Sequence, residues 1–407
     1  MEIRSAERRD SRAIAALWTH AFPGERTAAD RVHQLETGGT FGGIEATFVA
    51  QSQGRMVGAL RAYRMTQYIG ASALPMMGLA SVAVSPDARR SGIGREMCRQ
   101  ILRLARERGD IVSALYPFRP AFYRSLGWGL VGELHGYRFA PESLSAEAAA
   151  IPVRLAVLPT DEPAIAACYE RVARMSTGLI ARNERVWRQH LDARDTHVFV
   201  LDEVRPRGYM LVRYGRARSP DHKPLIVREL IAEDPAAYDA LLAWIASQRD
   251  QWRRVRYDAT PHEHFALRLA DPRLSGSRPA RALWAPVARI IRGPMLRILD
   301  VTAAFERRQS WGPAVPHRFA LDVRDPELPE NAGPFTIDFD GRSATVTTGR
   351  DADVLLRTDA ATLAQLYAGE IGVSAAVRLG SAQADGDVSA VDAMLRSDSS
   401  FRLLDVF

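Results

Sequence analysis

The segment that most constrains this 407-residue chain is Arg89-Arg90-Ser91-Gly92-Ile93-Gly94, which lies between an apolar strand and a long amphipathic helix. Apolar residues predict the strand over Leu79–Val84, and apolar residues at helical spacing predict the helix over Ile93–Arg108. Small residues there let backbone N–H groups approach a ligand, and the start of a helix favours an anion such as a pyrophosphate. The segment therefore predicts an α/β domain with an anion-binding loop.

The pattern R-x-x-G-x-G is short, so its context decides its meaning. Residue frequencies alone predict about one match in a chain this rich in Arg and Gly, and a second match occurs at Arg124–Gly129. In that second match, Gly127 follows a short helix, where glycine is a common C-cap. We expect neither a P-loop, because G-x-x-x-x-G-K-[ST] is absent, nor a dinucleotide site.

Residues 1 to about 145 alternate strand and helix signals. A helix is expected over Asp10–Ala21, and one or two helical turns over Pro120–Leu126. The expected strands are Thr47–Gln51, Met56–Met65, Ser72–Met77, Leu79–Val84, Ile111–Tyr116 and one that begins at Trp128. This order is typical of a mixed α/β domain.

Residues from about 146 to 288 repeat this rhythm more weakly and lack the glycine segment. The expected helices are Glu162–Met175 and Ala236–Gln251, and the expected strands are His197–Asp202, Gly208–Tyr214, Leu225–Ile231 and Val255–Asp258. The resemblance of this order to the first block indicates an internal duplication.

Residues from about 289 onward are richer in proline and are expected to form an α+β domain. Phe335–Phe339 and Ser343–Thr347 predict a hairpin, because Asp340-Gly341 has the preferred turn chemistry. The other expected elements are strands over His317–Val323 and Ala352–Thr358 and three short helices within Ala360–Arg396.

Cysteine usage and the first residues indicate a soluble, cytoplasmic protein. Cys98 and Cys168 are the two cysteines, which argues against a disulfide scaffold and fits a reducing compartment. The charged start of the chain lacks the apolar core of a signal peptide. The uncharged stretch Met65–Pro86 is interrupted by glycine and proline, so we expect buried strands there and no membrane span.

The net charge of +6 is an arginine effect, because Lys223 is the one lysine among 54 basic residues. A nucleic-acid-binding protein would gather these charges on one face, whereas here arginine is spread along the chain among 48 acidic residues. We therefore expect no nucleic-acid partner. His262-Glu263-His264 does not match H-E-x-x-H, so we interpret it as a surface loop and expect no metal.

The strand, the R-x-x-G-x-G segment, the long helix, the next strand and the helix around Ala121-Phe122-Tyr123 together resemble the GNAT family of N-acetyltransferases. The resemblance implies acetyl-CoA as cosubstrate. It also implies a bulged strand whose backbone pairs with pantetheine and a loop whose amides hold the pyrophosphate. The cofactor-binding residues so implied are Val82, Ala83, Val84, Arg89, Arg90, Ser91, Gly92, Ile93, Gly94, Arg95, Phe118 and Arg119.

A narrower resemblance covers the whole chain and is to the Eis (enhanced intracellular survival) family. It implies two tandem GNAT-like domains, a catalytic one at residues 1–145 and a degenerate one at 146–288, followed by a sterol-carrier-protein-like α+β domain at 289–407. Met295-Leu-Arg-Ile-Leu-Asp-Val301 resembles the segment that introduces the third domain. Members of the family are commonly homohexamers, and several acetylate aminoglycosides or other amines.

The same resemblance assigns two catalytic groups. Tyr123 would protonate the departing CoA thiolate, and the carboxylate of the C-terminal Phe407 would receive the amine proton. A phenol with a reference pKa of about 10 suits that donor role, whereas an α-carboxyl group with a pKa of about 3.5 matches an ammonium poorly. Two simpler interpretations stay open: Tyr123 packs against the sheet, or Phe407 fills the core while its carboxylate lies at the surface.

A polycationic acceptor needs acidic residues, and Glu25, Asp30 and Asp405 are the nearest candidates, although all three could simply be solvated. The substrate residues that we expect are Trp18, Phe22, Glu25 and Asp405. Aminoglycosides or similar polycationic amines are the expected acceptors, and polyamines and protein lysines are the alternatives. A further alternative is lipid binding by the C-terminal domain, which would need a large apolar tunnel.

Overall fold

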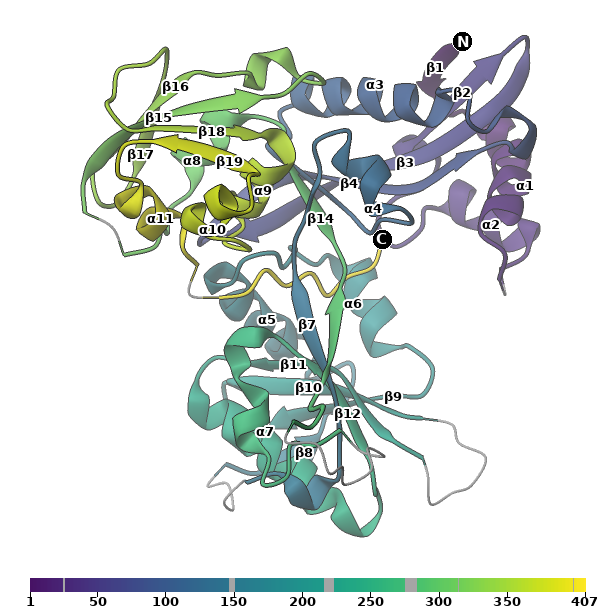
Figure 1. Ribbon diagram of the computed structural model, residues 1–407. Helices are drawn as coiled ribbons and strands as arrows, with labels where there is room; N and C mark the ends of the chain where they lie inside the picture. The colour runs from purple at the N-terminus through teal and green to yellow at the C-terminus, as the bar shows by residue number, and fades with distance from the viewer. Residues whose placement is uncertain (25, 146–150, 216–222, 275–283, 314, 398) are drawn as a thin grey trace. The chain divides into compact units, whose positions relative to one another are not determined.

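The computed structural model describes the chain in two units, each of which is presented by itself (Figure 1). The described residues are all of 1–407 except 25, 146–150, 216–222, 275–283, 314 and 398. The first unit comprises Met1–Gly132, Thr177–Ala181 and Gly293–Phe407. The second unit comprises Glu133–Ser176 and Arg182–Arg292.

A seven-stranded sheet forms the N-terminal part of the first unit. Its strands are β1 (Glu2–Ser5), β2 (Thr47–Ser52), β3 (Arg55–Ile69), β4 (Ser72–Val84), β5 (Val112–Leu115), β6 (Gly129–Leu130) and β14 (Met295–Ile298). Their order in the sheet is β1-β2-β3-β4-β5-β14-β6. All neighbours are antiparallel except β4 and β5, which are parallel.

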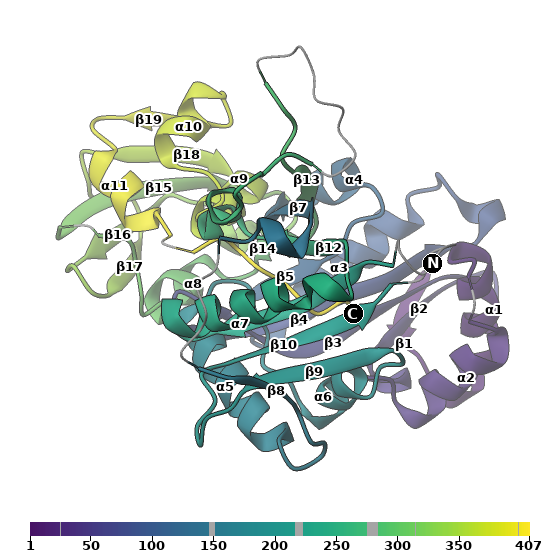
Figure 2. The ribbon, with the colours of Figure 1, turned by 90° about the horizontal axis from the view of Figure 1, so that it is seen from below.

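The helices of this part are α1 (Ser11–Ala21), α2 (Ala28–Thr37), α3 (Ile93–Glu107) and α4 (Pro120–Arg124). The helices α1 and α2 lie side by side (Figure 2). The helix α3 buries Met97 and Ile101 against the sheet, as its apolar spacing predicts. No apolar pattern predicts α2, which begins with a capping box between Thr27 and Asp30.

The strand β4 is continuous, although the sequence predicts two strands there, Ser72–Met77 and Leu79–Val84. Gly78 lies in the middle of β4 and pairs with Tyr63 of β3. A Cβ atom at Gly78 would lie 2.6 Å from the sulfur of Met65 and 3.1 Å from the ring of Phe407. The glycine therefore marks the close approach of another segment and does not break the strand.

The second unit contains a sheet of its own with the same plan. Its strands are β7 (Glu133–Phe139), β8 (Val153–Leu155), β9 (Thr196–Leu201), β10 (Gly208–Tyr214), β11 (Leu225–Ala232), β12 (Val255–Ala259) and β13 (Arg289–Arg292), and its helices are α5 (Glu162–Met175), α6 (Glu184–Leu191) and α7 (Pro235–Ser247). The strand order is β13-β7-β12-β11-β10-β9-β8, with β11 and β12 the parallel pair. Because both sheets place their parallel pair at the same point in the order, the structure agrees with an internal duplication.

The strands do not follow the expected domain boundaries at residues 145 and 288. The strand β7 precedes residue 145 but belongs to the second sheet. The strand β14 follows residue 288 but completes the first sheet between β5 and β6. A boundary drawn by segment order alone misses this arrangement, because pairing between distant strands leaves no local signal.

The C-terminal part of the first unit is an α+β fold. Its strands are β15 (His317–Arg324), β16 (Phe335–Phe339), β17 (Ala344–Thr348), β18 (Leu355–Asp359) and β19 (Ala382–Asp385), and its helices are α8 (Val301–Arg307), α9 (Ala360–Tyr367), α10 (Val373–Arg378) and α11 (Ser389–Leu395). The sheet order is β17-β16-β15-β18-β19. The predicted hairpin is present, and Asp340 accepts backbone hydrogen bonds from Arg342 and Ser343 in its turn. Residues of this part share one apolar core with β4, β5 and β14.

The structure gives the context of two sequence motifs. A G-x-G-x-x-G pattern does occur, from Gly127 to Gly132, but it runs from α4 into β6, the reverse of the strand-to-helix order that a dinucleotide site needs. In the second unit, Glu263 accepts hydrogen bonds from the Thr260 amide and the Tyr238 hydroxyl, so this residue of the His-Glu-His trio has a capping role. None of the helices in the described ranges is long and apolar enough to cross a bilayer.

Candidate active site

The end of β4 has the backbone geometry that a strand-like ligand needs. Ala59 of β3 pairs with Ala83 and Arg61 pairs with Ala80, so one residue opposes two and β4 bulges at Ser81 and Val82. On its other edge β4 pairs with β5 only over Met76–Gly78 in the described structure. The backbone beyond Gly78 therefore has no strand partner on that side, and it can hydrogen-bond an extended ligand such as pantetheine.

The loop that follows β4 has an open helix start. Gly92 is the N-cap of α3 with φ of +86°, and a Cβ atom there would meet nothing within 4 Å. Arg90 also has a positive φ, +64°. The first amides of α3 lack helical partners and carry the positive end of the helix dipole. A pyrophosphate fits this loop, because it needs both N–H donors and positive potential.

The corresponding loop of the second unit is filled by the protein itself. There Asp234 caps α7, and its carboxylate accepts a hydrogen bond from the Ala237 amide at 2.8 Å. Arg207 also binds Asp234, at 2.6 Å. A carboxylate therefore occupies the place where the first unit leaves an open helix N-terminus. The second unit therefore lacks, at this helix, the open N-terminus that the first unit has at Gly92.

The arginines of the loop are not equivalent. Arg89 and Arg90 are exposed, and Arg89 donates to the carbonyl of Val84 at 3.4 Å. Arg95 instead directs its guanidinium to Ser125 and to Glu327 at 3.4 Å. Its expected role at a pyrophosphate is therefore limited to its backbone amide.

Tyr123 lies on α4 in an aromatic cluster. Its ring makes edge contacts with Phe122 and Trp128, at 5.0 and 6.0 Å between centroids, and it is 3% exposed. Phe118, which is 66% exposed, contacts the same ring, and Arg119 is the exposed N-cap of α4. Burial, with a smaller contribution from Cys98, raises the pKa of Tyr123, so the hydroxyl stays protonated at neutral pH.

The C-terminal residue docks on the first sheet. The ring of Phe407 lies over Gly78 and contacts Phe41, Tyr63 and Tyr116 at centroid distances of 5.8, 6.4 and 6.2 Å. Gly78 provides the space for this ring, because a side chain there would collide with it. The C-terminus is therefore held by aromatic packing and does not project freely.

The segment before Phe407 is also fixed. The Tyr116 hydroxyl donates to the carbonyl of Leu403 at 2.8 Å, and the Arg402 amide donates to the carbonyl of Thr177 at 2.8 Å. Asp405 is 1% exposed. Burial raises the pKa of Tyr116, and the negative charge of Asp405 raises it further. The C-terminal segment therefore places the carboxylate of Asp405 near Tyr116, in addition to the terminal carboxylate of Phe407.

The expected substrate residues have different surroundings. Trp18 is 1% exposed and donates from its indole to the carbonyl of Ser81 at 2.8 Å, which gives it a structural role at the bulge. Phe22 is 36% exposed at the end of α1. Asp30 accepts the capping hydrogen bonds of Thr27, and Glu25 lies outside the described residues.

The aromatic residues around Phe407 are those that sequence reasoning missed. Phe41, Tyr63 and Tyr116 are far apart in the chain, so no local pattern joins them. One signal was available: Gly78 within an apolar strand indicates that something approaches the backbone closely. The approaching group is the ring of Phe407.

Replacing Gly92 with valine is expected to lower acetyl-CoA affinity at least tenfold. A branched side chain is strained at φ of +86° and projects into the open space proposed for the pyrophosphate. Gly109→Val is the matched control, because Gly109 at the other end of α3 has φ of +87° and equally open space. Calorimetry on both folded variants checks this. Equal affinities for the two would show that the loop does not bind the cofactor.

Comparisons with known proteins identify the domains of the chain. The family described as acetyltransferase (GNAT) domain matches residues 2–131, a second family of the same description matches 178–298, and the sterol carrier protein domain matches 301–401. The crystal structure of a GCN5-related N-acetyltransferase from Anabaena variabilis superposes with a TM-score of 0.84 over 100% of both chains at 22% identity. The structure of Eis1 from Mycobacterium abscessus gives 0.80, also over 100% of both chains at 22% identity. The fold and these matches define an N-acetyltransferase with two GNAT domains and a sterol carrier protein domain.

Sequence relatives narrow this class. The N-acetyltransferase Eis of Mycobacterium tuberculosis (strain ATCC 25177 / H37Ra) is 30% identical over 315 residues, 74% of this chain and 72% of that protein. An uncharacterized N-acetyltransferase of Streptomyces avermitilis is 29% identical over 404 residues, 92% of this chain and 89% of that protein. The chain belongs to the Eis family of N-acetyltransferases.

Proposed function

We propose that this enzyme transfers the acetyl group of acetyl-CoA directly to a primary amine, with Tyr123 as general acid and the Phe407 carboxylate as base. The docking of the C-terminus carries the proposal. Chain ends usually fray, whereas Phe407 is packed over β4 in the unit that also holds the open loop and Tyr123. A fixed terminus supports a role for its carboxylate. The experiment is a CoA-release assay with acetyl-CoA and an amine panel; no turnover with any amine would contradict the proposal.

The proposed reaction balances with these two groups. The amine nitrogen attacks the thioester carbonyl, so that a C–N bond forms and the C–S bond breaks. The Phe407 carboxylate receives the proton that the amine loses, directly or through a water molecule. The Tyr123 hydroxyl gives a proton to the departing thiolate, for which its raised pKa keeps it protonated.

The acceptor that we propose is an aminoglycoside or a similar polycationic amine. The carboxylate of the C-terminus supports a preference for cations, and the buried charge of Asp405 nearby adds negative potential. Polyamines and protein lysines have the same reacting group and are the alternatives. The amine panel separates them: kcat/KM should be higher for kanamycin than for spermidine or for a lysine-containing peptide.

The C-terminal α+β part is proposed to position the chain end rather than to carry lipid. Its interior is filled by large side chains, including Phe305, Phe319, Phe339 and Tyr367, all 0–1% exposed. Two cavities at the surface of this part include charged residues such as Arg324 and Asp359 in their lining. These observations favour a scaffold over a carrier with an apolar tunnel.

We also propose that the enzyme is a homohexamer and that it is located in the cytoplasm. Trp284 and Ile290 of the second unit are 89% and 69% exposed, and large exposed apolar side chains favour a subunit interface. The two cysteines are buried free thiols, in keeping with a reducing compartment. Analytical ultracentrifugation tests the assembly, and a monomer at micromolar concentration would contradict it.

A further inference from the structure

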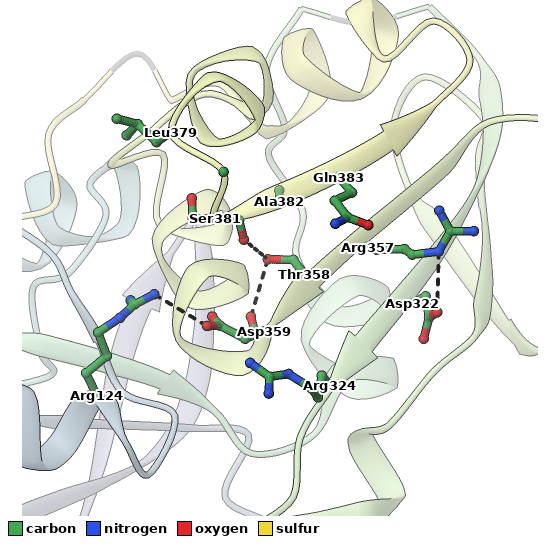
Figure 3. Close-up of a pocket in the computed structure, with 11 residues that line it drawn as sticks. Arg124, Asp322, Arg324, Arg357, Thr358, Asp359, Leu379, Ser381, Ala382 and Gln383 are labelled. Carbon is green, nitrogen blue, oxygen red and sulfur yellow. Dashed lines mark hydrogen bonds and ion pairs between the residues drawn. The ribbon is translucent and has the colours of Figure 1, made fainter.

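Two neighbouring cavities lie between α4 and the C-terminal α+β part of the first unit. The first, of about 510 Å³, is drawn in Figure 3, and the second is about 400 Å³. Arg124, Arg324 and Asp359 line both of them. We call the two together the arginine cavity. The loop at Gly92 contributes no lining residue, so this cavity is separate from the proposed acetyl-CoA site.

The arginine cavity contains an unpaired guanidinium. Arg124 contacts Asp359 at 3.4 Å, and Arg357 binds Asp385 at 2.8 Å. Arg324 is exposed and forms no ion pair or hydrogen bond through its side chain with any residue of the described ranges. Figure 3 shows Arg324 and Arg124 on the same side of the cavity, next to Asp359. The pairing of the other two arginines leaves one positive charge available to an anion.

A second, buried guanidinium is only partly satisfied. Arg297 lines the smaller cavity, is 0% exposed, and binds both oxygens of Asp325 through Nη2 at 2.7 and 2.9 Å. Its Nε and Nη1 atoms have no hydrogen-bond partner within the described structure. Buried N–H groups are normally paired, because leaving them unmet is costly. Both atoms are buried, so Arg297 adds positive potential behind the wall of the smaller cavity and makes no direct contact with a ligand.

The rest of the first cavity is polar but mostly neutral. Thr358 and Ser381 contribute hydroxyl groups, and Gln383 contributes an exposed amide. Such groups, together with the carboxylates of Asp322 and Asp359, recognise hydroxyl groups by donating and accepting hydrogen bonds. A guanidinium favours phosphate, because its N–H groups match the phosphate oxygens.

We propose that the arginine cavity binds a small phosphorylated polyol, such as a sugar phosphate or an inositol phosphate. Arg324 pairs with the phosphate, and the Thr358, Ser381 and Gln383 side of the cavity receives the hydroxylated body. The volume of about 510 Å³ is in the range of small-molecule sites. The same headgroup could be free or carried on a lipid, and the experiment separates these sources.

The test is calorimetric titration of the full chain with glucose 6-phosphate, inositol 1-phosphate and glycerol 3-phosphate. Saturating coenzyme A is present, so that phosphate cannot bind at the Gly92 loop. We expect saturable binding of at least one probe, weaker binding of inorganic phosphate and none of glucose. The variant Arg324→Gln should lose at least tenfold in affinity. Arg350→Gln, which removes an exposed arginine outside the cavity, should bind as wild type does.

Two outcomes would contradict the proposed phosphate site. Absence of binding for all three probes, or equal affinity for wild type and Arg324→Gln, would overturn the proposal. A second experiment measures the binding of wild type and Arg324→Gln to vesicles that contain phosphatidylinositol. Vesicle binding that depends on Arg324 supports a headgroup carried on a lipid, and binding of the free probes alone supports a soluble ligand.

Discussion

Replacing Tyr123 with phenylalanine is expected to lower kcat by about 10²–10⁴-fold and to leave the KM of the amine nearly unchanged. The ring would keep its contacts with Phe122 and Trp128, so the packing of α4 should not change. The hydroxyl makes no hydrogen bond within the described residues, so its removal leaves no buried partner unsatisfied. The substitution therefore isolates the proton that the thiolate would receive.

Steady-state CoA release measures this effect, and calorimetry should show unchanged acetyl-CoA affinity. Tyr214→Phe is a matched control, because Tyr214 of β10 is also packed against an aromatic ring and lies in the second unit. The raised pKa of Tyr123 adds a second check: between pH 6 and 9 the wild-type kcat should show no loss from ionisation of this phenol. A Tyr123→Phe variant within a few-fold of wild-type kcat would assign the tyrosine to packing and the proton to water.

Changing the C-terminus by one residue is expected to lower kcat at least about 100-fold. Deletion of Phe407 removes the ring over Gly78 and leaves Val406, which is 68% exposed, as the last residue. Addition of one glycine after Phe407 keeps the ring and moves the carboxylate by about 3.8 Å. Both changes misplace the base, but only the deletion removes packing.

The two variants differ in stability, and this separates catalysis from folding. Deletion should lower the free energy of unfolding by about 1–3 kcal/mol, because it removes a half-buried aromatic side chain. The glycine extension should leave it within about 0.5 kcal/mol of wild type. Denaturant unfolding and acetyl-CoA calorimetry check both variants. If the extended chain turns over normally, the terminal carboxylate is not the base.

Elements with a strong local pattern were predicted well from the sequence. The periodic apolar residues of α3 and α5 and the turn at Asp340-Gly341 specify local structure directly, and the structure contains all three elements. The sequence also placed the Gly92 loop correctly between a strand and a helix, and its cofactor role stays a prediction.

The proposed acceptor side depends on contacts between distant segments, so it was harder to predict from the sequence. Phe41, Tyr63, Tyr116 and Phe407 meet through the sheet register and through the fold of the C-terminal part, neither of which has a local signature. The same limit explains β14, because its pairing with β5 joins residues such as Met295 and Leu115, which are 180 positions apart. Composition shows that arginine is the dominant cation of the chain. It does not show that Arg324 lacks an ion-pair partner within the described residues, because ion pairing depends on the folded structure.

The most direct test of the proposed mechanism is the kcat of a chain whose C-terminal carboxylate is replaced by a neutral amide. Expressed protein ligation can attach a synthetic C-terminal peptide ending in Phe407 amide, and the same ligation with the free acid provides the control. The amide keeps the ring contacts with Phe41, Tyr63 and Tyr116 and removes only the charge and basicity of the terminus. We predict that kcat falls at least about 100-fold relative to the ligated acid, with acetyl-CoA affinity unchanged. Equal kcat for the amide and the acid would contradict the assignment of Phe407 as the base.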